Sequence, residues 1–389
     1  MDISSQQHEL LTETFINQIN YLKKELSELK KENFHLKQYI NELIKENTKT
    51  KVSFQQLLNL ISSIPIISQQ LFPSKNKSNT LTIKDIQIKL KLDFLHSDYV
   101  FSAIQLSDQR IATGGGDGNI TVSTINPDFN DYSQDILLQN AHSKGIRYLC
   151  EINNKLFSCS NDKTIKIWLL SKHTVKLIKT ISTHHNAVYK IIKLSEDTFA
   201  SCSEDNTVKI ILSNEPYTVI KTLIHSHPVY SIIKLANKDI LISSCSLPSI
   251  DFWDLQTYQR IHSIEGIYAF MPSHMIELSN GNVAVSLRTG VSDCKIAIID
   301  TEKFCVVKEI VDSKFIVDMS SLCVWDNDSF VFVDEKKFVQ ISMVDYTVKY
   351  KKKFNEVIGG YYGILNINKG ECLGVHSFGS VILLKSLSE

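Results

Sequence analysis

Histidines, cysteines and one glycine run are the residues of this chain whose types and spacing could do chemistry. His184-His185 and His225-Ser-His227 bring imidazoles close together, a spacing that can serve a metal ion. The run 114–118 (Gly-Gly-Gly-Asp-Gly) is similar in composition to a phosphate-binding loop, but it lacks the Gly-Lys-[Ser/Thr] ending and precedes a strand-like segment. Neither a Gly-x-Ser-x-Gly elbow nor a His-Glu-x-x-His pair occurs.

The histidines recur in a fixed relation to an aliphatic residue four positions later. The pairs are His96/Val100, His142/Ile146, His184/Val188 and His225/Val229. This regularity favours structural histidines over metal ligands. We therefore expect no metal, no cofactor and no catalytic residues. The glycine run is interpreted as a turn in which glycine supplies left-handed conformations.

Three cysteines lie 43 residues apart, at Cys159, Cys202 and Cys245. Each has serine on both sides, so we interpret them as one strand position that recurs in a repeat. Buried free cysteine behaves as a small hydrophobic residue. With no secretory signal and no Cys-x-x-Cys pair, we expect neither disulfides nor a structural zinc site.

A repeat of about 43 residues extends over the chain beyond residue 80. Its clearest part is a polar turn followed by a strand, as in Asp162-Lys-Thr-Ile-Lys-Ile-Trp168. Seven equivalent strand residues are separated by 45, 43, 42, 46, 43 and 42 positions: Ile120, Ile165, Val208, Ile250, Ile296, Val339 and Val381. This period fits one four-stranded propeller blade per unit.

The units resemble WD repeats over roughly residues 83–389. That resemblance implies a buried hydrogen-bonded tetrad, which the second unit carries in full as His142, Ser158, Asp162 and Trp168. The other early units depart from it: Ser123 and Ile211 stand at the tryptophan position, and Leu247 replaces the turn aspartate. The last three units keep the strand pattern and lose most of the tetrad.

The last unit stops at its third strand, near Val381 to Leu387. Residues 83–94 alternate apolar and polar side chains, which indicates a strand, and we predict that this strand completes the last blade. The expected fold is therefore an all-β seven-bladed WD-repeat propeller over 81–389, closed by strand 83–94 and preceded by an α-helical coiled coil.

The coiled coil is predicted over 8–48, where glycine and proline are absent and apolar residues step by four and three. Leucine at the d positions and one asparagine in the seam favour a parallel homodimer. The dimerisation residues are Ile19, Leu22, Leu26, Leu29, Asn33, Leu36, Ile40 and Leu43. A single amphipathic helix folded onto its own domain is the alternative. Residues 49–80 are expected to form a short second helix and a polar linker.

Bulk properties exclude several classes of partner. Lysine plus arginine and aspartate plus glutamate are both 42, so no net charge draws the chain toward nucleic acid. No apolar run is long enough for a transmembrane segment. The N-terminus has no basic start and no apolar core of a signal peptide, so a cytoplasmic protein is expected.

The remaining candidate site is the propeller face beside the histidine–aliphatic step. The residue after the aliphatic is Phe101, Arg147, Tyr189 and Tyr230 in successive units, and Tyr99 lies nearby. Aromatic residues and arginine dominate binding hot spots, so these five are the predicted partner-binding residues. The alternative is that they only pack between blades.

The function expected from these features is a non-enzymatic scaffold or adaptor, dimerised by its coil. Two alternatives stay open: a heterotrimeric G-protein beta-like signalling subunit whose helix pairs with a small gamma-like partner, and an Atg16-like autophagy adaptor. An enzyme on the propeller axis is a third and more distant class.

Overall fold

A computed structural model describes most of the chain beyond residue 84. The described ranges are 85–92, 95–126, 131–246, 249–266, 271–288, 294–311, 322–334, 337–354, 364–368, 371–375 and 381–387. The chain divides into two units, Met1–Asn79 and Thr80–Glu389. The predicted coiled coil, second helix and linker (8–80) lie outside the described residues.

The described part consists of β-strands, arranged in seven four-stranded antiparallel sheets. We number the sheets 1–7 in chain order. Sheet 1 contains β2 (Val100–Gln105), β3 (Ile111–Gly115), β4 (Ile120–Ile125) and β5 (Tyr132–Leu138). Sheet 2 contains β6 (Ile146–Ile152), β7 (Lys155–Ser160), β8 (Ile165–Leu170) and β9 (Val175–Ile181). Sheet 3 contains β10 (Val188–Lys193), β11 (Thr198–Ser203), β12 (Thr207–Leu212) and β13 (Val219–Ile224).

The later sheets repeat this up-and-down order. Sheet 4 contains β14 (Val229–Lys234), β15 (Ile240–Cys245), β16 (Ser249–Asp254) and β17 (Arg260–Glu265). Sheet 5 contains β18 (Met271–Glu277), β19 (Val283–Arg288), β20 (Cys294–Asp300) and β21 (Cys305–Val311). Sheet 6 contains β22 (Leu322–Asp326), β23 (Ser329–Asp334), β24 (Lys337–Ser342) and β25 (Val348–Lys353).

Sheet 7 joins the two ends of the second unit. It contains β26 (Ile364–Asn368), β27 (Glu371–Val375) and β28 (Val381–Leu387), with β1 (Asp85–Leu92) as its fourth strand. β1 pairs antiparallel with β28, from Asp85 opposite Leu387 to Leu92 opposite Val381. The segment for which the sequence predicts a closing strand, 83–94, contains β1.

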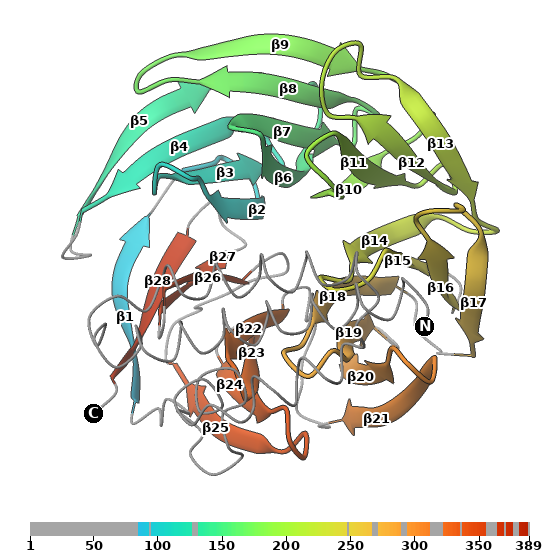
Figure 1. The fold of residues 1–389 in the computed structure, drawn as a ribbon. Coiled ribbons are helices and arrows are strands. Elements are labelled where there is room, and N and C mark those ends of the chain that lie inside the picture. The colour runs from blue at the N-terminus through green and yellow to red at the C-terminus, as the bar shows by residue number, and fades with distance from the viewer. Residues whose placement is uncertain are drawn as a thin grey trace, which may run out of the picture. The chain divides into compact units, whose positions relative to one another are not determined.

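The first strand of sheets 1–6 lies toward a common centre and the fourth strand at the periphery, as Figure 1 shows for β2, β6, β10 and β14 against β5, β9, β13 and β17. Each first strand contacts the first strand of the next sheet, and β26 of sheet 7 contacts β2. This is a β-propeller arrangement. No helix among the described residues has the length and apolar character needed to cross a membrane.

The core consists of apolar layers between neighbouring sheets. One layer joins sheets 2 and 3 and includes Phe157, Cys159 and Phe199. Another joins sheets 7 and 1 through Leu92, Val381 and Val100. Successive side chains of a strand point to opposite faces of its sheet, and both faces are covered by neighbouring sheets. The second strands β3, β7, β11 and β15 therefore consist almost entirely of apolar and small residues.

The interpretation of the three cysteines as one strand position is wrong. Cys159 and Cys202 occupy one strand position, but Cys245 does not: it pairs with Val229, as Ser160 pairs with Ile146. Despite the equal spacing of 43 residues, Cys245 lies one residue further along its strand than Cys159 and Cys202 do along theirs. A shift of one residue turns a side chain to the opposite face of the sheet. Cys159 and Cys202 therefore pack toward the following sheet, whereas Cys245 packs toward the preceding one.

The glycine run forms the predicted turn only at residues 116–118. Gly114 and Gly115 are strand residues of β3, and only Gly118 of the run takes a positive φ, of 76°. Gly115 is needed for space, because a Cβ there would lie 2.4 Å from His96 Nδ1. Gly118 is the left-handed residue of the turn, as Lys163 and Asn206 are in sheets 2 and 3.

Candidate partner-binding surface

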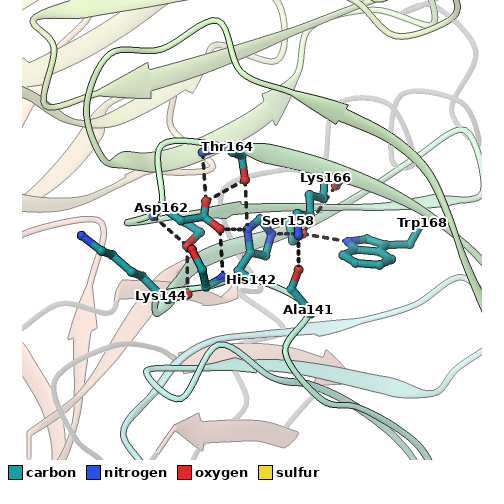
Figure 2. A network of polar contacts seen from close by, with 10 residues as sticks. Ala141, His142, Lys144, Ser158, Asp162, Thr164, Lys166 and Trp168 are labelled. Atoms are coloured by element: carbon teal, nitrogen blue, oxygen red, sulfur yellow. Dashed lines mark hydrogen bonds and ion pairs between the residues drawn. The ribbon is translucent and has the colours of Figure 1, made fainter.

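A buried hydrogen-bonded chain links the strands of sheet 2 (Figure 2). Trp168 Nε1 donates to Ser158 Oγ at 2.8 Å, and Ser158 Oγ lies 2.7 Å from His142 Nε2. The other ring nitrogen, Nδ1, lies 2.9 Å from Asp162 Oδ2. The structure therefore brings the four predicted tetrad residues together in one chain of contacts.

Sheets 1 and 3 contain the same chain without the tryptophan. His184 lies 2.8 Å from both Asp205 Oδ2 and Ser201 Oγ, and Ile211 fills the tryptophan position in the core. In sheet 1, His96 lies 3.0 Å from Asp117 Oδ1 and 2.8 Å from Thr113 Oγ1. Both ring nitrogens of these histidines have hydrogen-bond partners within the sheet, which supports their structural role.

Sheet 4 keeps only the inner half of the chain. Trp253 Nε1 donates to Ser243 Oγ at 2.9 Å, and Ser243 Oγ lies 2.8 Å from His225 Nε2. His225 Nδ1 turns to the carbonyl oxygen of Leu223 at 3.2 Å. Leu247, which replaces the turn aspartate, lies outside the described residues.

Electrostatics in these chains favour neutral histidine beside ionised aspartate. Burial lowers the pKa of His142 and of His184 below the usual value, although Asp162 and Asp205 act in the opposite direction. Burial alone would raise the pKa of Asp117, but hydrogen bonds from His96, Asn119 and Ser97 lower it to about 2. Each carboxylate is thus a fixed hydrogen-bond acceptor at neutral pH.

A backbone hydrogen bond anchors the residue just before the first strand of each of sheets 1–4. The carbonyl oxygen there accepts a backbone hydrogen bond from the residue that follows the second strand. These bonds are Gly116 N to Tyr99 O, Asn161 N to Gly145 O, Glu204 N to Ala187 O and Ser246 N to Pro228 O. The entry of each first strand is therefore held in the same geometry in four successive sheets.

A β-bulge follows directly after each of these anchors. In β2, Val100 pairs with Gly115 and Ser102 with Gly114, so Phe101 is the extra residue. Arg147, Tyr189 and Tyr230 occupy the same position in β6, β10 and β14. Bulges re-aim side chains at strand ends, which explains why these four project together.

The predicted partner-binding residues form a continuous row, here called the aromatic row: Tyr99, Phe101, Arg147, Tyr189 and Tyr230. The Tyr99 and Phe101 rings stack with centroids 6.4 Å apart. The guanidinium carbon of Arg147 lies 4.6 Å from the Phe101 centroid and 5.5 Å from that of Tyr189. The Tyr189 and Tyr230 centroids are 4.7 Å apart.

Exposure within the row is graded. Tyr99 is 40% exposed, and the other four side chains are half-buried. Phe101 packs closely on two glycines, since a Cβ at Gly145 would lie 3.0 Å from its ring. These side chains therefore pack between sheets and also reach the protein surface.

Arg147 carries the charge of the row. Its Nε donates to Asn161 Oδ1 at 2.8 Å, which fixes the guanidinium plane between the two rings. Among the described residues, no carboxylate lies within ion-pair distance of this guanidinium. An oriented arginine of this kind suits a carboxylate or a carbonyl oxygen.

The two tyrosine hydroxyls stay protonated at physiological pH. Burial raises the pKa of Tyr189, and the neighbouring Tyr230 and Glu204 raise it further. Burial also raises the pKa of Tyr230. The row therefore offers neutral phenol groups beside one cation.

Sequence reasoning missed the supports of this row. Asn161 and Gly145 orient Arg147 and Phe101, yet neither residue type signals binding on its own. The signal that could have identified Asn161 is its position in the repeat. The equivalent residue of each sheet directly follows the second strand: Gly116, Asn161, Glu204 and Ser246.

A family model described as "WD domain, G-beta repeat" matches residues 135–168 and 175–211. These two segments are WD40 repeats. Each matched segment begins near the fourth strand of one sheet and ends at the third strand of the next, as 135–168 runs from β5 to β8. The repeat unit is therefore offset by one strand from the sheet.

One curated relative is the ubiquitin homeostasis protein lub1 of Schizosaccharomyces pombe (strain 972 / ATCC 24843). It is 30% identical over 105 residues, which is 27% of this chain and 14% of that protein. The chain thus matches only about one seventh of the relative's length.

Proposed function

We propose that this chain is a non-enzymatic interaction scaffold of the cytoplasm: a seven-bladed WD-repeat propeller that binds a partner protein through the aromatic row. The propeller arrangement and the WD40 repeats support an interaction role. Seven sheets whose first strands contact one another in series, with β26 contacting β2, support the count of seven blades.

The observation that carries the proposal is the row itself. Four equivalent bulges place an arginine and three aromatic side chains in mutual contact, at the entry of four neighbouring strands. A structural role would need only one apolar residue per bulge. Aromatic residues around a single oriented arginine are the composition of a binding hot spot.

The chemistry of the row indicates the kind of segment it recognises. Arg147 presents donors that lack a carboxylate partner among the described residues, and aromatic rings flank it on both sides. A partner segment with an acidic side chain next to an apolar or aromatic one would satisfy both features.

The partner face is tested with a triple variant of the full chain, Arg147→Ala with Tyr189→Ala and Tyr230→Ala. A triple variant on outer strands, Leu177→Ala with Ile220→Ala and Ile261→Ala, is the matched control because those exposed side chains lie on the fourth strands β9, β13 and β17, whereas the bulges lie on first strands. The first variant should lose the proteins that the wild-type chain recovers from its cell lysate, and the second should keep them. Equal recovery by both folded variants would refute the assignment.

Ubiquitin is the first defined protein to titrate against the chain, because the fission-yeast relative is named for ubiquitin homeostasis. Saturable binding that the Arg147 triple variant abolishes would assign ubiquitin to the row. Binding that this variant retains would place ubiquitin elsewhere.

We further propose that the coiled coil over 8–48 makes the scaffold a parallel homodimer, which doubles its valency. The heptad with Leu22, Leu29 and Leu36 at d and Asn33 in the seam supports this proposal. A mass measurement in solution tests it: the full chain should be a dimer, and the chain without residues 1–50 should be a monomer. Isolation as one chain with one small helical partner would favour the G-protein beta-like alternative.

A further inference from the structure

Sheet 4 differs from its neighbours on the face where the histidine lies. Cys245 stands opposite Val229, at the position of Ser160 and Ser203. Those serine hydroxyls each accept a turn backbone N–H and each donate to a carbonyl oxygen. Sheet 4 therefore places a thiol where its neighbours place a hydroxyl that stabilises the turn.

Asp251 is the second departure. It stands opposite Ser243, where sheets 2 and 3 carry Lys166 and Lys209. The residue is 2% exposed, and its Oδ1 atom is buried without a hydrogen bond. A buried carboxylate oxygen without a hydrogen bond is costly, so a cationic group that compensates for it is expected.

Arg260 supplies only part of that compensation. Its guanidinium forms an ion pair with Asp251 Oδ1 at 3.6 Å, which is longer than a hydrogen bond, and its side chain is 54% exposed. The exposed position leaves the arginine side chain room to withdraw from the carboxylate.

Asp251 also does not replace the turn aspartate of the tetrad. In sheets 1–3 the aspartate lies 2.8–3.0 Å from histidine Nδ1. Asp251 Oδ2 lies 3.9 Å from the opposite nitrogen, His225 Nε2, which already contacts Ser243 Oγ.

We propose that His225, Cys245 and Asp251 form a zinc-binding site, with one imidazole, one thiolate and one carboxylate as ligands. All three residues are buried, and their donor atoms lie within 4.8 Å of one another. Tetrahedral zinc ligation at about 2.0–2.3 Å needs donor separations of about 3.3–3.8 Å, so side-chain shifts of about 1 Å would close the site.

Zinc binding releases one proton from the site. The Cys245 thiol gives its proton to solvent as the sulfur–zinc bond forms, and neutral His225 donates its Nε2 lone pair in place of its contact with Ser243. Ser243 Oγ keeps the hydrogen bond from Trp253 Nε1. A water molecule completes the four ligands, and the thiolate and the carboxylate neutralise the charge of the ion.

This donor set is selective for metals of zinc type. Thiolate and imidazole favour zinc over magnesium and calcium, which prefer oxygen ligands. The inference is independent of the aromatic row, whose residues belong to the bulges of sheets 1–4, and it contradicts the sequence expectation of no metal. That expectation rested on the regular histidine spacing, which carries no information about the residues at positions 245 and 251.

The test uses the full chain carrying Cys305→Ser, because Cys305 is an exposed thiol that could bind metal adventitiously. The metal-depleted protein is titrated with zinc against a chromophoric chelator, and separately with cobalt(II) as a spectroscopic probe. We expect one zinc per chain and a sulfur-to-cobalt charge-transfer band. Asp251→Asn and Cys245→Ala should each weaken zinc binding at least tenfold, and Cys245→Ala should remove the band.

Cys202→Ala is the matched control, since Cys202 is a buried strand cysteine of the neighbouring sheet that lies outside the cluster. It should bind zinc and cobalt as the parent does. Arg260→Ala should bind zinc at least as tightly as the parent, because it removes the competing cation. No stoichiometric zinc in the parent, or a cobalt band that survives Cys245→Ala, would overturn the proposal. If Cys245→Ala fails to fold, Cys245→Ser takes its place, because serine occupies the equivalent position in sheets 2 and 3, and this variant should also lose the band.

Discussion

The guanidinium carbon of Arg147 lies 4.6 Å from the centre of the Phe101 ring, although the two residues belong to different sheets and are 46 positions apart. Both are the extra residue of a β-bulge. Equivalent bulges in neighbouring sheets therefore bring together side chains that are one repeat apart in the sequence. The aromatic row is a consequence of this repetition.

Arginine and lysine at position 147 should not be equivalent. Arg147→Ala removes the charge and the stacking, and we expect at least a tenfold loss of partner affinity. Arg147→Lys keeps the charge but loses the planar group between Phe101 and Tyr189, so an intermediate loss is expected. Titration calorimetry with the recovered partner measures both. An unchanged affinity for folded Arg147→Ala would exclude the arginine from the site.

Ser158 and Ser201 allow a matched comparison of the tetrad. Ser158→Ala leaves both His142 Nε2 and Trp168 Nε1 without their partner, whereas Ser201→Ala affects only His184. Each unsatisfied buried group costs about 1–3 kcal/mol. Chemical denaturation should show the larger loss of unfolding free energy for Ser158→Ala. A larger loss for Ser201→Ala would contradict the role given to the tryptophan bond.

Lys163 is a strained turn residue. Its φ is 74°, at the position where sheet 1 has Gly118 with a φ of 76°. Lys163→Gly should relieve a conformational penalty of about 1 kcal/mol and raise or preserve the melting temperature, while Lys163→Val should lower it. Thermal unfolding of the two variants beside the parent decides this. A clear loss of stability in Lys163→Gly would contradict the assigned conformation.

Acid should destabilise the fold in two steps, first through the buried His142 and then through Asp117. The folded pKa of His142 lies below its unfolded value of about 6.5, so the unfolded chain binds more protons below that pH and stability falls as pH decreases. The pKa of Asp117 falls from about 4 unfolded to about 2 folded, so its contribution is complete above pH 4 and is lost toward pH 2.

Asp117→Asn provides the measurement. The variant should be less stable than the parent at pH 7, and the difference should shrink as the pH falls from about 4 to about 2. Denaturant unfolding at a series of pH values records both curves. A difference that stays constant down to pH 2 would show that the Asp117 charge does not contribute.

The sequence was most informative where a side chain had to repeat. His142, Ser158, Asp162 and Trp168 were predictable as a set, because a buried hydrogen-bonded chain restricts residue type at every position. Four residues of the aromatic row were found by their place directly after the aliphatic residue, and Tyr99 was included because it lies nearby. Their mutual contacts were not predictable, since these depend on bulges that leave no composition signal.

Register was the main source of error. Cys245 matched Cys159 and Cys202 in spacing and in its serine neighbours, but it lies on the opposite face of its strand. The glycine run was interpreted as a turn although Gly114 and Gly115 belong to β3. In both cases the local sequence resembled a repeat position or a turn. The strand register, which decides where each side chain points, depends on pairing with the neighbouring strands.

The binding role of the aromatic row is tested most directly by site-specific photo-cross-linking. Tyr99, 40% exposed, is replaced with a photoreactive phenylalanine analogue in the full chain, and Leu177 on β9, 44% exposed, receives the same group as the control. We expect a covalent adduct between the chain and its partner from position 99 and none from position 177. An adduct from position 177 with none from position 99 would contradict this expectation.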